Sequence, residues 1–415
     1  MPSPTPFQEP FRAAVEDGTI VGVVLAATNK SGTLNYAEAF GKTGASPDAD
    51  ALTVEATFWI ASCTKLVTTI ATLQCIERGL FALDAPDDIA RLLPEYASPE
   101  LLRGFDEDGQ PTTKPAENRI TMRQLLTHTS GLAGEFGNPE LSAWRAGRKR
   151  KGHASETDVV ERLQSPLVFE PGEGWDYSTL GMDWVGQIIE RANGNVSLER
   201  YVQDNICGPL GMHDTTFHLE RVAGVAQRLA GMSVRAGENG RLAHMPGHLM
   251  HDPAAYGSGG GGLYASAPDF LKVLTSIMRD DGKLLRSESV ADMFVPQLSP
   301  ASKDAWMGKL QVDVVNRIMT GGMKVGTDLS WGLGGMCSLA DTEGKRKKGS
   351  LAWGGYPNLF WWIDREGGMA GLYASQVIPA GDPQSTALFA EFEAGVYQMA
   401  ITEGSARDEA TPSQV

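Results

Sequence analysis

The chain has 415 residues, enough for one large core or for two domains of ordinary size. Its hydrophobic fraction of 42% and charged fraction of 21% are typical of a soluble globular protein and exclude a disordered chain. The net charge of -15 argues against nucleic-acid binding, which needs a basic face. The N-terminal residues lack the basic and apolar parts of a secretory signal, and no apolar run approaches a membrane helix. We therefore expect a cytoplasmic protein, monomeric or a small homo-oligomer.

The cysteines predict no metal or disulfide framework. Cys63, Cys75, Cys207 and Cys337 are scattered without a CxxC pair, and HExxH is absent. We interpret all four as small buried residues on helices. We expect no metal and no cofactor.

The N-terminal part predicts a β-hairpin followed by a buried helix. Residues 20–29 and 34–40 read as two strands joined by a turn at Ser31-Gly32. Residues 62–78 have apolar positions at helical spacing, and Gly79 is a natural stop. Several threonines lower the helix propensity of this segment, so burial must stabilise it.

The remaining elements indicate helices in the middle of the chain and strands near its end. The clearest helices are 120–127, 183–192 and 267–278. Strand patterns return at 350–353, 359–364 and 369–375, before a final helix at 385–401. We expect one sheet built from distant segments, in an α/β domain of residues 1–83 and 328–402. Residues 84–327 would form a largely helical domain, with the site between the two, and 403–415 a disordered tail.

The strongest chemical signal is the S-x-x-K tetrad of Ser62 and Lys65 at the start of the first predicted helix. Positions three apart lie on one helical face, so the lysine amine can reach the serine hydroxyl. Near a helix N-terminus the unpaired N–H groups favour a developing oxyanion. Apolar neighbours would lower the pKa of Lys65, so that its amine can accept a proton. Alone the tetrad is a weak signal, because Ser62 can equally be an N-cap with Lys65 in solvent.

Two later segments favour the catalytic interpretation. A Gly-rich turn delivers Tyr177 to the head of a predicted helix, and a nearby lysine ammonium would lower the pKa of its phenol. A short strand ends in Gly354-Gly355, where backbone N–H groups can approach a substrate carbonyl. A half-buried tyrosine and an ordinary strand-end turn are the plainer alternatives. The three elements together favour an acyl-enzyme on Ser62.

With these motifs the chain resembles the serine β-lactamase and penicillin-binding superfamily. Within it the chain is similar to class C-like family VIII carboxylesterases, and most to fungal lovastatin-type acyltransferases. The similar stretches include SCTKLVTTIATLQCIERGL, LLTHTSGL, NICGPLGMHDTTF and KGSLAWGGYPN, and they span about residues 12–400. The resemblance implies a β-lactamase-like mixed α/β fold, with an antiparallel sheet flanked by helices and an inserted, mostly helical domain. It implies Ser62 as nucleophile, Lys65 and Tyr177 as the base pair, and an oxyanion hole of the Ser62 and Tyr356 N–H groups.

Two departures from the lactamase pattern bear on the substrate. The Y-x-N motif is here Tyr177-Ser178-Thr179, and Trp353 stands where the K-T-G lysine would be. Losing two polar recognition groups disfavours β-lactams and favours esters or thioesters of short apolar acyl groups. The predicted substrate-binding residues are Trp353, Gly354, Gly355, Tyr356, Thr179, Trp175 and Phe136.

Three other features receive plainer interpretations. Residues 257–262 match GxGxxG but lack a preceding strand, so we expect a flexible loop near the site mouth and no dinucleotide. His128 has no partner aspartate in a motif and reads as structural. Residues 145–151 form a basic cluster, most simply a solvated loop; the sharper hypothesis is a docking patch for an acidic acyl-carrier domain.

The sequence thus predicts a serine esterase or acyltransferase that passes an acyl group from Ser62 to water or to an alcohol. Hydrolysis and transfer use the same residues, so the sequence does not separate them. A β-lactamase or DD-peptidase-like activity is one alternative. A non-catalytic binding protein with the same fold is another, although such a protein needs neither Lys65 nor Tyr177.

Overall fold

The computed structural model describes residues 7–134, 138–150, 158–247, 249–250 and 253–410. Its centre is a seven-stranded sheet in the order β2-β1-β13-β12-β11-β10-β9, antiparallel throughout. The strands are β1 (Gly22–Asn29), β2 (Asn35–Gly41), β9 (Leu329–Trp331), β10 (Met336–Ser338), β11 (Leu351–Gly355), β12 (Leu359–Asp364) and β13 (Met369–Ala374). Both ends of the chain therefore meet in one sheet, as predicted.

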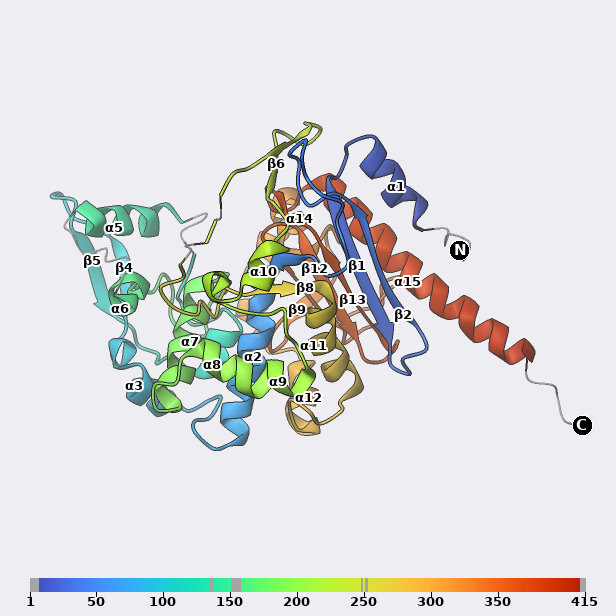
Figure 1. The fold of residues 1–415 in the computed structure, drawn as a ribbon. Coiled ribbons are helices and arrows are strands. Elements are labelled where there is room, and N and C mark those ends of the chain that lie inside the picture. The colour runs from blue at the N-terminus through green and yellow to red at the C-terminus, as the bar shows by residue number, and fades with distance from the viewer. Residues whose placement is uncertain (1–6, 135–137, 151–157, 248, 251–252, 411–415) are drawn as a thin grey trace, which may run out of the picture.

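Helices cover both sides of this sheet (Figure 1). α15 (Pro383–Ala410) and α1 (Glu9–Glu16) lie on the outer side, and α11 (Ala267–Arg279) packs against β1, β12 and β13 from the inner side. Because both faces are covered, every residue of β12 and β13 is buried. This explains why these strands read as continuous apolar runs rather than as alternating patterns.

The inner side leads to a mostly helical region. It contains α3 (Pro86–Leu92), α4 (Met122–Leu126), α5 (Pro139–Arg150), α6 (Val159–Leu163), α7 (Thr179–Ala192), α8 (Leu198–Val202), α9 (Gly208–Leu210) and α10 (Ala223–Gln227). A hairpin of β4 (Glu100–Phe105) and β5 (Pro111–Pro115) projects beside α5 (Figure 1). Side-chain caps fix several of the helix starts, such as the Ser178 hydroxyl that accepts the Gly181 N–H. Further along the chain follow α12 (Ser287–Met293), α13 (Pro300–Lys309) and α14 (Asp313–Thr320).

Between the two regions runs α2 (Thr64–Glu77), preceded by the 3₁₀ turn η1 (Ala61–Cys63). Its threonines bond within the interior, since Thr69 and Thr72 donate to carbonyls four residues earlier and Thr68 donates to Gly259. The helix is buried over most of its length. Burial thus stabilises a segment of modest propensity, as expected.

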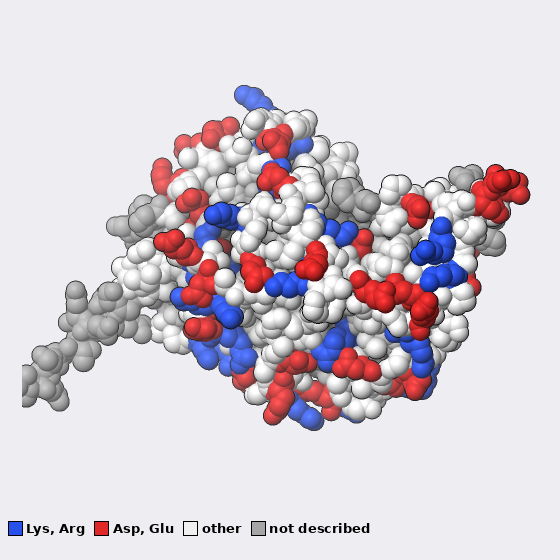
Figure 2. Space-filling model, turned by 180° about the vertical axis from the view of Figure 1, so that it is seen from behind, with Lys and Arg blue, Asp and Glu red and all other residues white. Residues whose placement is uncertain are grey.

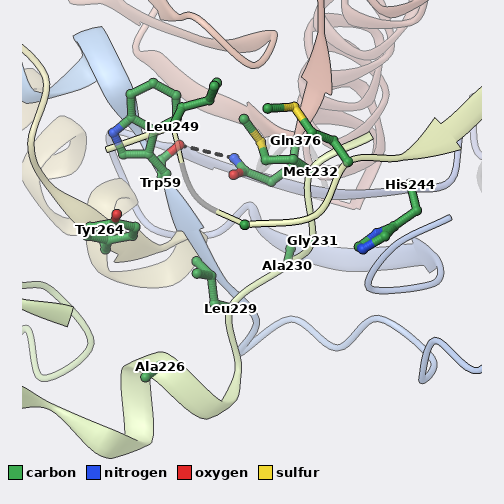
Figure 3. Close-up of a pocket in the computed structure, with 12 residues that line it drawn as sticks. Trp59, Ala226, Leu229, Ala230, Gly231, Met232, His244, Leu249, Tyr264 and Gln376 are labelled. Atoms are coloured by element: carbon green, nitrogen blue, oxygen red, sulfur yellow. Dashed lines mark hydrogen bonds between the residues drawn. The ribbon is translucent and has the colours of Figure 1, made fainter. Parts of the chain in front are cut away.

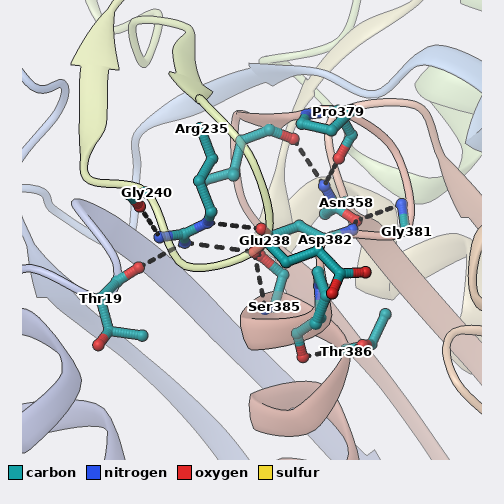
Figure 4. Close-up of polar contacts among 12 residues, drawn as sticks. Thr19, Arg235, Glu238, Gly240, Asn358, Pro379, Gly381, Asp382, Ser385 and Thr386 are labelled. Carbon is teal, nitrogen blue, oxygen red and sulfur yellow. Dashed lines mark hydrogen bonds and ion pairs between the residues drawn. The ribbon is translucent and has the colours of Figure 1, made fainter.

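Two small sheets position the segments around the site. β3 (Thr57–Trp59) pairs with β8 (Tyr264–Ser266), and β6 (Ser233–Arg235) lies between β7 (Leu242–His244) and β14 (Val377–Ile378). The buried Arg235 guanidinium ties β6 to the start of α15, with Nε 2.6 Å from Asp382 Oδ1, while Asn358 holds the Asp382 backbone N–H (Figure 4). The hairpin of β6 and β7, here called the β6–β7 arm, is therefore fixed to the sheet domain by a buried ion pair.

The structure corrects several expectations. α11 lies against the central sheet, although the division at residues 84–327 had placed it in the helical domain. α15 continues to Ala410, so residues 403–410 of the expected disordered tail are helical. Cys337 lies on β10 and not on a helix, although all four cysteines are buried thiols as predicted. The sequence patterns gave no sign of the two small sheets, because each strand has only two or three residues.

Candidate active site

Ser62 lies in the 3₁₀ turn between β3 and α2. Ala61, just before it, has a positive φ of 45°, which is unusual for a residue with a side chain. This sharp entry turns the chain from strand to helix at the serine. Within this turn the Cys63 N–H donates to the Ile60 carbonyl. The Ser62 N–H comes one residue earlier, before the hydrogen bonds of the helix begin. It is a donor suited to an oxyanion.

The Lys65 amine is buried next to the serine hydroxyl. Nζ lies 3.1 Å from Ser62 Oγ, 3.3 Å from Thr179 Oγ1 and 2.6 Å from the Gly260 carbonyl oxygen. These partners come from three separate segments of the chain. The predicted contact within the tetrad is present, and Thr179 contacts the lysine, whereas the sequence had suggested a contact with substrate.

Burial changes the protonation of Lys65. Loss of solvation lowers the pKa of the amine from 10.5 to about 7, although the nearby Asp183 carboxylate opposes this shift. A substantial fraction of the amine is therefore neutral near pH 7 and can accept a proton. The predicted direction is confirmed, and its cause is burial as expected.

Tyr177 precedes α7 and brings its phenol to the same place. Its hydroxyl accepts a hydrogen bond from Trp353 Nε1 at 3.1 Å, and Lys65 Nζ lies 4.6 Å from the centre of its ring. The expectation of a lowered phenol pKa is wrong: burial raises it, although hydrogen bonding to Ser62 and Trp353 acts in the opposite direction. Tyr177 therefore remains a protonated phenol at neutral pH.

The glycine run 257–262 is part of the site floor and not a flexible loop at its mouth. All of its residues are buried, and the Gly260 N–H donates to Asp183 Oδ1 at 2.9 Å while its carbonyl faces Lys65. A Cβ at Gly260 would lie 2.4 Å from the Thr179 carbonyl oxygen. Only glycine allows this approach. No sequence motif marked Asp183, although an aspartate within an apolar helix is a signal of a buried polar role.

The Tyr177 ring packs against a cluster of buried rings that includes His128, Trp175 and Trp331. The His128 ring lies 4.7 Å from the Tyr177 ring, and its Nδ1 accepts the Ser178 N–H. Burial lowers the pKa of His128 well below its ordinary value, with a smaller contribution from Lys65, so the ring is neutral. Trp175 is only 2% exposed and packs 4.3 Å from Trp306. It supports the cluster from the core and has no surface for a substrate, contrary to prediction.

The end of β11 lies directly against η1, the turn that contains Ser62. Gly355 approaches so closely that a Cβ would lie 2.4 Å from the Ile60 carbonyl oxygen. Tyr356 follows and is 47% exposed, with its ring 6.4 Å from that of Trp59. Trp353 is buried and directs its indole N–H at Tyr177. Gly354 and Gly355 end the strand beside the Ser62 turn, whereas Phe136 lies outside the described residues.

A cavity of about 240 Å³ opens beside Trp59, between β3 and the β6–β7 arm (Figure 3). The Trp59 carbonyl accepts a hydrogen bond from Gln376 at one wall. No carboxylate, ammonium or guanidinium occurs among the lining residues that the structure describes. These are Trp59, Ala226, Leu229, Ala230, Gly231, Met232, His244, Met245, Gly247, Leu249, Tyr264 and Gln376. The cavity therefore suits a neutral, largely apolar group.

In the described part of the chain no three His, Cys, Asp or Glu side chains gather in a way that could hold a metal ion. No described helix has both the length and the hydropathy needed to cross a bilayer.

A serine hydroxyl beside a buried, partly neutral lysine is the arrangement of a serine hydrolase or acyltransferase that works through an acyl-enzyme. The chain belongs to the beta-lactamase family, whose family model matches residues 7–392. It is 38% identical to the monacolin J acid methylbutanoyltransferase of Aspergillus terreus, over 93% of this chain and 94% of that protein. It is 34% identical to the lovastatin esterase of Penicillium rubens, over 94% of this chain and 97% of that protein.

The structural comparison agrees. Unliganded simvastatin synthase from Aspergillus terreus superposes with a TM-score of 0.88 at 36% identity, covering 95% of this chain and 97% of that one. The predicted β-lactamase-like fold and the resemblance to lovastatin-type acyltransferases are confirmed. These relatives are acyltransferases and esterases, and this chain is an enzyme of the same serine class.

Proposed function

We propose that Ser62 is the acylated nucleophile, Lys65 its base and Tyr177 the proton relay. The observation that carries this proposal is the 3.1 Å contact between Lys65 Nζ and Ser62 Oγ in a site where burial brings the lysine pKa to about 7. A neutral amine at this distance can take the serine proton as the new bond forms. The raised phenol pKa of Tyr177 supports Lys65, and not Tyr177, as the group that holds the proton.

The cycle has two half-reactions. Ser62 Oγ attacks the carbonyl carbon of an ester or thioester while its proton moves to Lys65, and the Ser62 and Tyr356 N–H groups bind the oxyanion. The bond to the leaving group breaks, and that group takes the proton from Lys65 through the Tyr177 hydroxyl. Water or an alcohol then attacks the acyl-enzyme, and its proton passes to Lys65. The bond between the acyl carbon and Ser62 Oγ breaks, Oγ takes the proton back from Lys65, and the acid or ester product leaves.

Intact mass spectrometry tests this proposal. The protein is incubated with short-chain p-nitrophenyl esters and acyl thioesters, with and without a bulky alcohol. We expect the mass of one acyl group on the peptide that contains Ser62. Folded protein that acquires no acyl group, and no adduct with a fluorophosphonate, would instead favour the non-catalytic alternative. Turnover of nitrocefin would favour a lactamase.

The substrate we propose is an apolar acyl group transferred to a neutral alcohol, with hydrolysis as the competing outcome. Relatives named for methylbutanoyl transfer and for lovastatin ester cleavage support this choice. So does the cavity beside Trp59, which no described carboxylate, ammonium or guanidinium lines and which could take an apolar part of an acceptor. The absence of a cation at position 353, where Trp353 instead bonds Tyr177, disfavours the carboxylate of a β-lactam.

Charge at the cavity rim should weaken acceptor binding. Leu249 lines the cavity and is 42% exposed, so Leu249→Asp should leave the fold intact. We expect KM for a bulky apolar alcohol to rise about 10-fold, because an apolar contact worth roughly 1.5 kcal/mol is lost. Hydrolysis of a small p-nitrophenyl ester should change little. Val312→Asp is the matched control, since Val312 is 54% exposed and does not line the cavity; equal effects of both changes would contradict the assignment.

An acidic acyl-carrier domain remains a proposed partner, but the basic cluster is arranged differently from the expected loop. Residues up to Arg150 belong to α5, and Arg145 and Arg148 bond to groups of Arg162 and Gln164 at α6. Lys149 is exposed and supports docking more directly. On the face in Figure 2, basic and acidic side chains are interspersed. Lys149→Glu should slow transfer from a carrier-bound acyl group and leave transfer from a free thioester unchanged. Unchanged kinetics with the carrier-bound donor, with little dependence on salt, would contradict the proposed partner.

We also propose a reducing, cytoplasmic location, supported by four buried cysteines that are all free thiols. Cell fractionation would test it.

A further inference from the structure

Asp183 is a buried carboxylate of α7 that the catalytic cycle above does not use. Its Oδ1 accepts hydrogen bonds from Ser258 Oγ at 2.6 Å and from the Gly260 N–H at 2.9 Å. Its Oδ2 accepts from the Tyr256 hydroxyl at 3.3 Å. All three donors lie in one segment, at the glycine run. Such a set of donors stabilises a carboxylate that is otherwise costly to bury.

The bonds to Asp183 fix the position of Gly260, the residue whose carbonyl faces the amine of Lys65. Gly260 donates its N–H to Asp183 and presents its carbonyl oxygen to Lys65 Nζ at 2.6 Å. The short distance to the Thr179 carbonyl leaves no room for another side chain at Gly260. Asp183 is therefore connected to Lys65 through a single residue, Gly260.

We infer that Asp183 is a positioning residue of the proposed reaction, which fixes the Lys65 amine against Ser62 through Gly260 and supplies the negative charge that balances the amine when it is protonated. A carbonyl oxygen can only accept a hydrogen bond, so the Gly260 carbonyl accepts one N–H of the lysine whether the amine is neutral or protonated. Thr179 takes a second. In the neutral amine the lone pair is then directed at the Ser62 hydroxyl.

The other titratable groups around Lys65 are neutral near pH 7, so Asp183 is the charged group that influences the pKa of Lys65. Burial raises the pKa of the Cys63 thiol and of the Tyr177 and Tyr256 phenols, so these groups are neutral at pH 7. His128 is neutral because burial lowers its pKa well below the ordinary value. Asp183 has a raised pKa itself, through burial, but the three donors and Lys65 oppose that shift. The pH dependence of Lys65 should therefore report the charge of Asp183.

Asp183→Asn tests the inference, because asparagine keeps an oxygen acceptor for Gly260 and removes the charge. We expect the acid limb of the pH–kcat profile to move to lower pH by about one unit. Loss of the carboxylate lowers the pKa of Lys65, so its amine is neutral at a lower pH. Asp183→Ala should lower kcat roughly 100-fold with little change in KM, because the Gly260 carbonyl loses its support. A purely structural role would change stability without moving the limb.

Glu190→Gln is the matched control, since it removes a partly buried carboxylate from the same helix at a distance from Lys65. Its acid limb should coincide with that of the unaltered protein. If Asp183→Asn fails to fold, Asp183→Ala removes the same negative charge and should move the limb in the same direction. An unmoved limb in either folded variant overturns the inference. Failure of Ser62 to acylate in the unaltered protein would instead overturn the proposed function on which the inference rests.

Discussion

Ser62→Ala is expected to lower kcat/KM for p-nitrophenyl esters by at least about 10⁴-fold. The change removes the atom on which we propose that the acyl group forms, and the oxyanion donors alone would retain only a small part of the rate enhancement. No acyl mass should appear on the protein. Because Ser62 is half-buried and its hydroxyl contacts only the site, the melting temperature should stay close to that of the unaltered protein.

Cys63→Ala is the control for Ser62→Ala, because Cys63 is the neighbouring nucleophile by sequence. Its thiol is fully buried, and burial raises its pKa, so no thiolate is available at neutral pH. Activity should remain within a few-fold of the unaltered protein. Loss of activity in Cys63→Ala with retention in Ser62→Ala would reverse the assignment.

Lys65→Met should lower kcat about 1,000-fold, because methionine preserves the length and packing of the side chain but cannot accept a proton. In the unaltered protein, kcat should rise with pH through about 7 as Lys65 loses its proton. The residual rate of Lys65→Met should lack that step. Lys283→Met changes an exposed lysine paired with Asp281 and should leave the profile intact.

The same variant should also change how stability depends on pH. The unfolded lysine keeps its proton to about pH 10.5, whereas the folded one loses it near 7. Between these values the unfolded state binds more protons, so this group makes the free energy of unfolding rise with pH. Lys65→Met removes that contribution. Urea titrations at several pH values should therefore show a smaller rise for the variant; identical curves would mean that the folded amine keeps its ordinary pKa.

Local patterns were sufficient for the elements that frame the site. The β1–β2 hairpin, α2, α7, α11 and the strands β11 to β13 appear close to their predicted positions. They were predictable because side-chain periodicity and Gly turns act over a few residues. The end of α15 and the short strands β3 and β8 were not, because tertiary pairing and not local preference determines them.

The sequence by itself was enough to predict the groups of the proposed reaction, because Ser62 and Lys65 lie one helical turn apart and need only η1 and the first turn of α2 to bring them together. Tyr177 followed from its Gly-rich turn and from the family resemblance. Tertiary structure alone decided the state of these groups. The low pKa of Lys65, the raised pKa of Tyr177 and the contact from Asp183 through Gly260 to the amine depend on burial and on residues far apart in the chain. Solvation and long-range contacts have no local sequence pattern, so only the folded chain reveals them.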